Sequence, residues 1–153
     1  MPNLENRIPP PIIFVVVAIT MWLTASSSSA IDIDPTLRLA VVIVLIVFGV
    51  AVAFLGLKAF GKAKTTVNPV NIDAASSLVT TGVYGYTRNP MYVGLTSLLI
   101  AWAVYLSTPL ALLGPLVFVL YITRFQIAPE ERVLGRIFGR DYDDYRARVR
   151  RWL

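Results

Sequence analysis

The chain has 153 residues, of which 56% are hydrophobic and only 15% are charged, with a net charge of +5 and a mean hydropathy of +0.68. A soluble domain carries about 25% charged residues, so this composition excludes an ordinary soluble domain and indicates one all-α integral membrane domain over residues 1–153. The chain contains neither Cys nor His, which excludes disulfides, a Ser-His-Asp triad and zinc held by His or Cys, and we expect no bound metal.

Four uncharged stretches predict membrane-spanning helices, because about 20 apolar residues cross a bilayer and only a helix satisfies its own backbone there. Their ranges are 11–29, 39–57, 91–106 and 110–123. The first stretch follows Arg7 and is also compatible with a signal peptide, but the prolines before it and the later spans favour a retained helix. The last two stretches form a helical hairpin that turns at Pro109.

Within the second stretch, Gly49 and Ala53 are four residues apart. Small residues at this spacing allow close helix contact, either with a copy of the chain or, more commonly, within one chain. The sequence leaves the oligomeric state open.

The Lys and Arg residues predict the orientation of these helices. Of the 14, all except Arg38 fall on one side of the four-helix arrangement. The positive-inside rule therefore places both termini in the cytoplasm, at the inner membrane if the source is bacterial. Residues 61–90 and 124–153 then face the cytoplasm, and membrane lipids rather than nucleic acid are the expected polyanionic partner.

The segment after Arg124 has a different pattern. Apolar residues recur at helical spacing up to a break at Gly139 and then continue. This second stripe consists of Tyr142, Tyr145, Val149 and Trp152. Arginines occupy the opposite face, so we expect a C-terminal amphipathic helix that either lies on the membrane surface or caps the bundle as a solvated helix.

Polar residues that can bind an anion precede the third predicted span. Gly82 allows unusual backbone angles and close approach of a ligand. Pro90 suits the first turn of a helix with Asn89 at its cap, and the free N–H groups of such a helix start can bind a carboxylate or phosphate. Arg88 adds a forked donor for the same anion.

Aromatic and acidic residues near the same membrane face have two interpretations each. Tyr84, Tyr86 and Tyr92 offer flat faces to an adenine ring or a sulfonium cation, or they belong to a membrane-interface belt. Glu130 and Glu131 can accept the hydroxyls of a ribose, or they are helix-surface charges paired with Arg132 or Arg136. Two adjacent carboxylates on a helix point in different directions, so both do not readily serve one metal.

The ordered combination of these segments resembles the isoprenylcysteine carboxyl methyltransferase family, and more loosely the phospholipid N-methyltransferases. It consists of Arg88-Asn89-Pro90-Met91-Tyr92-Val93-Gly94, Glu130-Glu131, Phe138-Gly139 and the pair Tyr142 and Tyr145. The likeness covers roughly residues 61–153 and includes Lys64-Thr65-Thr66-Val67-Asn68-Pro69. Asn89 stands where the family commonly has His.

The resemblance implies that this chain binds S-adenosylmethionine. The segment from Val79 to Tyr84 and Tyr92 would wrap the cofactor, Glu130 and Glu131 would close the site, and Arg88 and Arg124 would hold a carboxylate. The cofactor-binding residues that it implies are Val79, Gly82, Tyr84, Arg88, Asn89, Pro90, Tyr92, Glu130 and Glu131. It names no catalytic residue.

The predicted function is therefore methyl transfer to a small or lipophilic acceptor, which is a carboxylate, an amine or a thiol. The sulfonium methyl is already activated, so catalysis is chiefly alignment. A carboxylate acceptor needs no base, whereas an amine would pass its proton to Glu130 or Tyr92. The alternatives are a non-catalytic scaffold or lipid-binding protein, and a nicotinamide-dependent membrane reductase.

Overall fold

The computed structural model describes residues 5, 7–63 and 77–153, and all the regular structure in this part of the chain is helical. The predicted all-α class is therefore confirmed there. Residues 64–76 of the predicted cofactor segment 61–90, including Lys64-Thr65-Thr66-Val67-Asn68-Pro69, lie outside the described residues. The elements are α1 (Pro10–Ala25), α2 (Pro35–Ala63), η2 (Gly82–Gly85), α3 (Pro90–Leu106), η3 (Pro109–Leu112), α4 (Leu113–Ile122), η4 (Thr123–Ile127), α5 (Ala128–Phe138) and α6 (Arg140–Arg148).

The helix boundaries follow local sequence signals. Proline is the first residue of α1, α2, α3 and η3, where its missing N–H costs nothing. Asp34 caps α2 by accepting a hydrogen bond of 2.9 Å from the Leu37 N–H, so this helix begins before the predicted residue 39. The first helix ends at Ala25 rather than at residue 29, because the serines that follow form turns and Ser26 bonds the Leu23 carbonyl.

The predicted fourth helix, 110–123, is only part of a longer one. η3, α4, η4 and α5 form one helical stretch from Pro109 to Phe138, and this stretch and Pro35–Gly61 of α2 are long and apolar enough to cross a membrane. α1 and α3 are shorter apolar helices.

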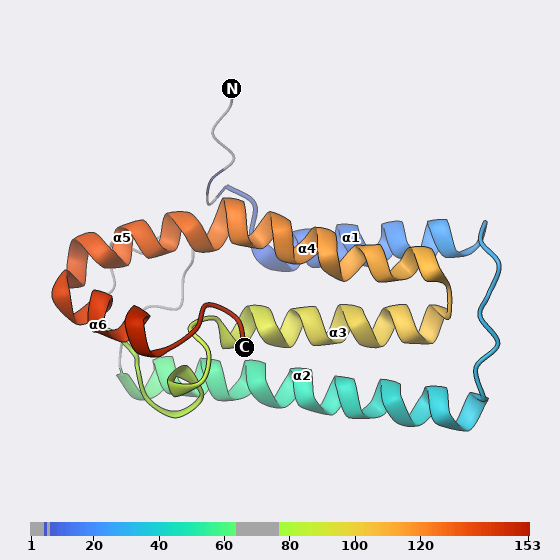
Figure 1. The fold of residues 1–153 in the computed structure, drawn as a ribbon, viewed down its shortest axis with the longest axis horizontal. Helices are drawn as coiled ribbons and strands as arrows, with labels where there is room; N and C mark the ends of the chain where they lie inside the picture. Colours follow the sequence, from blue (N-terminus) through green and yellow to red (C-terminus); the bar gives the residue numbers. More distant parts are fainter. Residues whose placement is uncertain (1–4, 6, 64–76) are drawn as a thin grey trace.

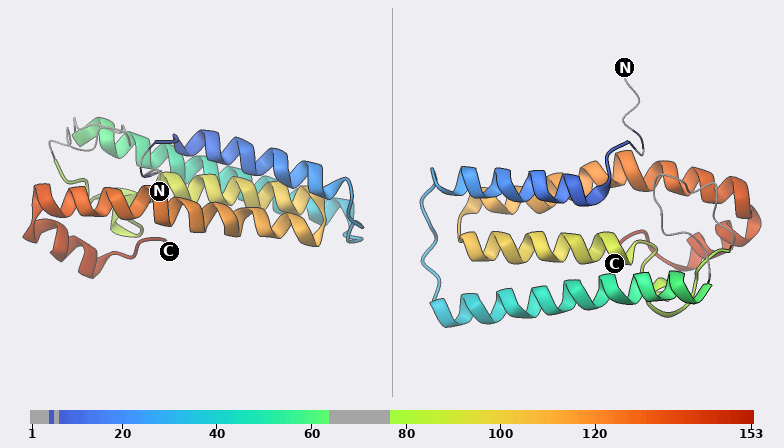
Figure 2. Two further views of the ribbon diagram at one scale, coloured as in Figure 1. Left: turned by 90° about the horizontal axis from the view of Figure 1, so that it is seen from above. Right: turned by 180° about the vertical axis from the view of Figure 1, so that it is seen from behind.

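α3 lies at the centre of the bundle, with α2 on one side and α1 and α4 on the other (Figures 1 and 2). α2 and α3 approach closely at small residues: a methyl group added to Gly94 would lie 2.6 Å from the Gly49 carbonyl oxygen and 2.9 Å from the Ala53 Cβ. The small residues of α2 therefore pack within the chain.

A second contact joins α3 to α1 and α4. Leu99 and Phe118 are fully buried there, and Trp102 donates a 3.1 Å hydrogen bond to the Ala18 carbonyl of α1. A side chain at Gly114 of α4 would overlap Met21 of α1. α3 is thus the element against which α1, α2 and α4 pack.

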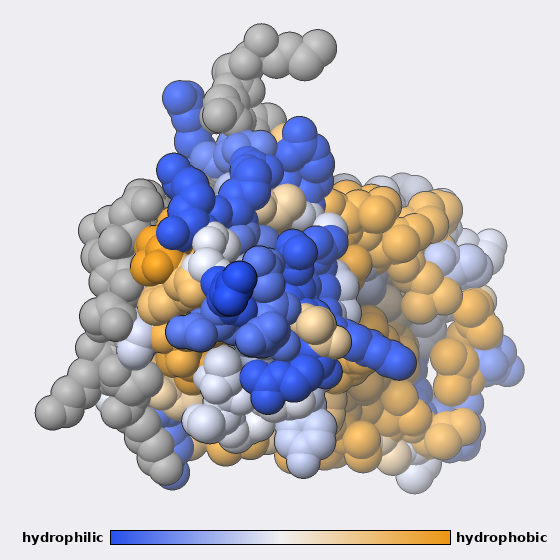
Figure 3. Space-filling view, turned by 60° about the vertical axis from the view of Figure 1, so that its left-hand side comes forward, coloured by the Kyte–Doolittle hydropathy of each residue, from blue (hydrophilic) through white to orange (hydrophobic). Residues whose placement is uncertain are grey.

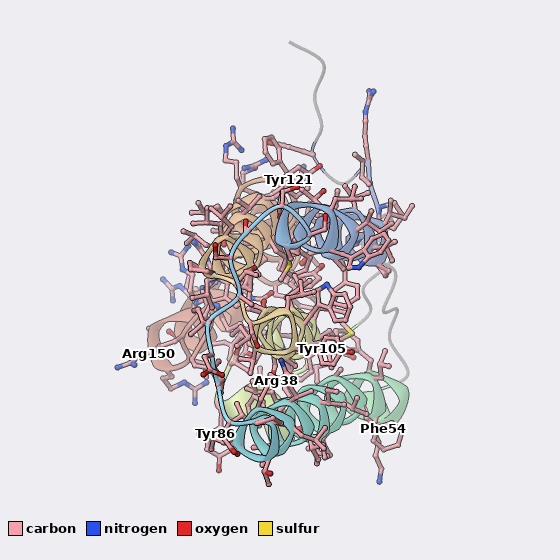
Figure 4. All side chains as sticks on the ribbon, turned by 90° about the vertical axis from the view of Figure 1, so that its right-hand side faces the viewer. Arg38, Phe54, Tyr86, Tyr105, Tyr121 and Arg150 are labelled. Atoms are coloured by element: carbon pink, nitrogen blue, oxygen red, sulfur yellow. The ribbon has the colours of Figure 1, made fainter. Side chains whose placement is uncertain are left out.

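The predicted hairpin turn is confirmed at the end of α3. Ser107 adopts a left-handed backbone with φ of 52°, and its carbonyl accepts a hydrogen bond of 2.6 Å from the Ile31 N–H of the α1–α2 loop. Arg38 reaches the Ser107 hydroxyl from α2 at 3.3 Å (Figure 4). This end of the bundle is opposite the end that carries α5 and α6 (Figure 1).

The outer faces of the long helices are apolar. Phe54 points outward from α2 and is 61% exposed (Figure 4), and Leu120 of α4 is 60% exposed. Hydrophilic side chains instead gather over the C-terminal helices, next to this apolar surface (Figure 3).

The C-terminal helix is divided at Gly139, as predicted, into α5 and α6. Tyr142, Tyr145 and Val149 are buried and pack against Leu78, Leu134 and Phe138 of the same chain. The expectation that this stripe faces a membrane surface is therefore wrong, since it finds its apolar partners inside the protein. α6 covers the end of the bundle instead.

Candidate functional site

The two predicted motif segments, 88–92 and 130–131, meet at the end of the bundle that carries α5 and α6. The N-terminus of α3, the start of α5 and the C-terminus of the chain come together there (Figure 1). Their side chains form two adjacent clusters. We call the cluster around Glu131 the strap cluster. The cluster around Glu130 is called the Glu130 cluster.

Arg88 lies at the centre of the strap cluster. One of its terminal nitrogens, Nη2, donates a 2.7 Å hydrogen bond to Glu131 Oε1, and both side chains are about nine-tenths buried, with 9% and 12% exposed. Its other terminal nitrogen, Nη1, donates to the carbonyls of Arg146 and Val149 at 3.1 Å each. Arg88 thus satisfies free carbonyls at the end of α6.

Residues 150–153, which we call the C-terminal strap, cross the start of α3. The Arg88 N–H donates to the Arg150 carbonyl at 3.0 Å, and the Asn89 amide donates to the Arg151 carbonyl at 2.8 Å. The Arg151 guanidinium pairs with Glu131 at 2.6 Å. The strap therefore connects the two motif segments.

The strap extends from this ion pair to the π-helical turn η4. Trp152 donates a 3.2 Å hydrogen bond to the Thr123 hydroxyl. Its ring packs against the buried core of the bundle, which includes Leu99 and Phe118. Hydrogen bonding to Glu131 raises the pKa of Arg151, so the pair is charged at neutral pH. Glu131 thus joins Arg88 and Arg151 as a fixed bridge.

The Glu130 cluster lies on the other side of the same helix. Tyr92 of α3 donates a 2.7 Å hydrogen bond to Glu130 Oε1, and Gln126 donates one of 2.8 Å to the same oxygen. Both donors are buried, at 7% and 3% exposed. Among the described residues, Glu130 forms no ion pair, and its Oε2 accepts no hydrogen bond.

Tyr84 borders the Glu130 cluster. Burial, and then the neighbouring Tyr145 and Glu130, raise the pKa of the Tyr84 phenol, so it is neutral at physiological pH. Its ring packs edge-on against Phe60 of α2, and its carbonyl accepts a 2.8 Å hydrogen bond from Tyr145. Burial also raises the pKa of Tyr145, and that of Tyr142 to about 12. The neutral phenol of Tyr145 therefore ties α6 to η2.

Glu130 and Glu131 diverge, as their adjacent positions on a helix predict. Neighbouring helical residues are about 100° apart around the axis, so the two carboxylates enter different clusters. Within residues 7–63 and 77–153, Glu131 has two cationic partners, whereas the hydrogen-bond donors to Glu130 are neutral.

The remaining predicted site residues of this region are Pro90, Val79 and Gly82. Pro90 packs against Gly56 of α2, where a Cβ would lie 3.1 Å from the proline ring. Val79 is buried, and Gly82 is exposed with φ of 65°. In the described part of the chain, no hydrogen bond joins Val79 or Gly82 to either cluster.

Two further candidate residues lie away from both clusters. Tyr86 is 80% exposed and points outward at the edge of the bundle (Figure 4). The Arg124 side chain is 63% exposed and pairs with Glu5 at 3.1 Å. Neither residue is positioned by this structure to hold a ligand of the Glu130 cluster.

Sequence reasoning missed Gln126 and Arg151. Gln126 has a recognisable signal, because it is an amide at the end of an apolar run and four residues before Glu130, a spacing that places both on one helix face. Arg151 has none, since it is one of many arginines in the tail.

The Glu130 cluster has the chemistry to bind S-adenosylmethionine. Its carboxylate has no cationic partner among the described residues and can balance the positive charge of a sulfonium or ammonium group, while the Tyr84 and Tyr92 rings offer aromatic faces. The free Oε2 can accept from an ammonium or a ribose hydroxyl. The residues present therefore fit this cofactor.

The chain is similar to several known proteins. A Haemophilus influenzae protein described as uncharacterized is 48% identical over 63 residues, which are 41% of this chain and all of that protein. A probable protein-S-isoprenylcysteine O-methyltransferase of Oryza sativa is 30% identical over 108 residues, 69% of this chain and 55% of the relative. The Saccharomyces cerevisiae protein-S-isoprenylcysteine O-methyltransferase is 28% identical over 111 residues, 69% of this chain and 44% of the relative.

The chain thus spans about half the length of the plant and yeast relatives. A sequence profile of the phospholipid methyltransferase family matches residues 37–141, which include both motif segments. Because this match covers more than half of the chain, the protein belongs to the phospholipid methyltransferase family, with distant homology to the isoprenylcysteine O-methyltransferases.

Proposed function

We propose that this protein is a multi-pass membrane methyltransferase that transfers a methyl group from S-adenosylmethionine to a small or lipophilic acceptor. The acceptor is a carboxylate, an amine or a thiol. The observation that carries the proposal is the junction of the two motif segments, in which Tyr92 bonds Glu130 and Arg88 bonds Glu131, each at 2.7 Å. The family's use of S-adenosylmethionine supports the choice of cofactor.

The apolar exterior supports a position within the membrane. Two helical stretches are long enough to cross it, and their outward side chains are largely aliphatic. In the described residues, Arg38 lies at the loop end of the bundle and the other arginines lie toward the site end. By the positive-inside rule, the site and both termini face the cytoplasm.

We assign different tasks to the two clusters. S-adenosylmethionine, when bound, supplies a methyl group that its sulfonium has already activated. Glu130 balances positive charge and accepts a hydrogen bond, while Tyr84 and Tyr92 pack against the ligand. Arg88, Asn89 and Glu131 hold the C-terminal strap across the start of α3, which keeps water away from the ligand and fixes its orientation.

The test is calorimetric titration of S-adenosylhomocysteine into the purified protein in detergent and in nanodiscs. The wild type should show saturable binding, and Glu130→Gln should weaken it at least tenfold, because the amide lacks the negative charge that attracts the ammonium group of the ligand. Glu5→Gln is the matched control, since Glu5 pairs with exposed arginines outside both clusters. Its affinity should equal that of the wild type.

Absence of binding by folded protein in both media would overturn the proposal. The non-catalytic scaffold would then be the better interpretation. Ultraviolet change on addition of reduced nicotinamide cofactor would favour the reductase instead.

A further inference from the structure

Gln126 is a buried polar side chain to which the proposed function assigns no task. It is 3% exposed, although it lies at the end of an apolar helical stretch. Its amide donates to Glu130 Oε1 at 2.8 Å. Burying an amide is unfavourable unless it makes hydrogen bonds, so its position needs an explanation.

The π-helical turn η4 places Gln126 there. The Ala128 N–H bonds the Thr123 carbonyl, five residues earlier, instead of the residue four earlier. Pro129 accounts for this turn, because it has no N–H to donate and its ring would clash with the Phe125 carbonyl of a regular helix. One extra residue in a turn rotates the helix that follows by about 100°, and such turns often occur at functional sites.

The rotation brings Glu130 to α3, and two neutral donors then converge on one of its oxygens. Tyr92 and Gln126 approach Glu130 Oε1 from different helical segments, at 2.7 and 2.8 Å. Two bonds from different directions fix the plane of the carboxylate. The second oxygen, Oε2, accepts no hydrogen bond from the described residues.

We propose that Gln126 is a positioning residue, which together with Tyr92 holds Glu130 Oε1 so that Oε2 meets a hydrogen-bond donor of the bound cofactor. The inference rests on the proposed function and adds a residue to its site. The ligand group that Oε2 meets is an ammonium or a hydroxyl group. Gln126 acts only through Glu130 and does not touch the ligand.

The experiment compares Gln126→Met, Glu130→Gln and the double variant in nanodiscs, with S-adenosylhomocysteine as the probe. Methionine has nearly the shape of glutamine but donates no hydrogen bond. Gln126→Met should weaken binding about tenfold, in line with the loss of a hydrogen bond to a charged group. The double variant should bind no more weakly than Glu130→Gln alone, because Gln126 works through that carboxylate.

Ser97→Ala is the matched control. Ser97 is also a buried polar helix residue, and it donates to the Leu45 carbonyl at 2.8 Å, away from both clusters. It should lower the thermal unfolding midpoint without changing affinity. If Gln126→Met does not fold, Gln126→Leu tests the same bond.

The outcomes separate the two proposals. No binding by the folded wild type overturns the proposed function. Wild-type binding that Glu130→Gln weakens but the Gln126 variant leaves unchanged overturns the positioning role alone. If the affinity loss of the double variant equals the product of the two single losses, the positioning role is also overturned. A merely structural residue would act independently of Glu130 in this way.

Discussion

Arg88 illustrates how one side chain can connect several segments at the residue scale. Its guanidinium bonds Glu131 from α5 and two carbonyls near the end of α6, while its backbone N–H bonds the strap. Its Nε is buried without a partner in the described structure. A charge this deeply buried is stable only beside its counter-charge, so Arg88 depends on Glu131.

Glu131→Gln should therefore lower the free energy of unfolding by about 2 kcal/mol, because it leaves Arg88 buried without a charged partner. The thermal unfolding midpoint in detergent measures this loss. Glu5→Gln is the control: its arginines are 63% and 56% exposed, and such pairs contribute less than about 1 kcal/mol. Equal losses in the two variants would contradict this view of the strap cluster.

The contact between α2 and α3 decides the packing at the scale of elements. Gly49 and Gly94 bring the two backbones together, and Ser97 adds a hydrogen bond to the Leu45 carbonyl. In a membrane, helices associate through such close packing because lipid provides no hydrophobic driving force. Tyr92 lies two residues before Gly94 on the same helix.

Gly94→Ala should destabilise the bundle by about 2 kcal/mol, since its methyl group would overlap the Gly49 carbonyl and force the helices apart. Gly61→Ala provides the opposite expectation. None of the described residues lies within 4 Å of a Cβ at this helical glycine, so alanine should stabilise by up to about 1 kcal/mol. If the unfolding midpoints of both variants shifted in the same direction, the result would argue against this packing.

At the scale of the whole molecule, the apolar bundle has one polar end that carries the site and one that carries the hairpin turn (Figures 1 and 3). The basic residues at the site end predict that it faces the cytoplasm. An acceptor and a soluble cofactor would then reach the site from the membrane and the cytoplasm respectively.

Single cysteines can test this orientation because the native chain has none. Ser29→Cys, in the exposed α1–α2 loop, should react with a membrane-impermeant maleimide on intact bacterial cells. Asp144→Cys, on the exposed face of α6, should react only after permeabilisation. The reverse labelling pattern would contradict the orientation, and the cysteine-free parent protein controls for background.

Much of the fold could be predicted because it depends on local properties. Uncharged runs, the helix-starting Pro90 and the break at Gly139 are all visible in the sequence and are found in the structure. The stripe containing Tyr142 shows the limit of this approach. Its helical spacing was visible, but a periodic pattern does not say whether the apolar face meets lipid or protein.

The sequence by itself determined the helical class, the hairpin, the divergence of Glu130 from Glu131 and the family motif. Only the tertiary structure decided that Asn89 and Arg88 bind the C-terminal strap, and that Gln126 and Tyr92 share one oxygen of Glu130. The physical reason is distance along the chain. Helix propensity and hydropathy belong to a segment, whereas contacts between distant residues exist only after the helices have packed.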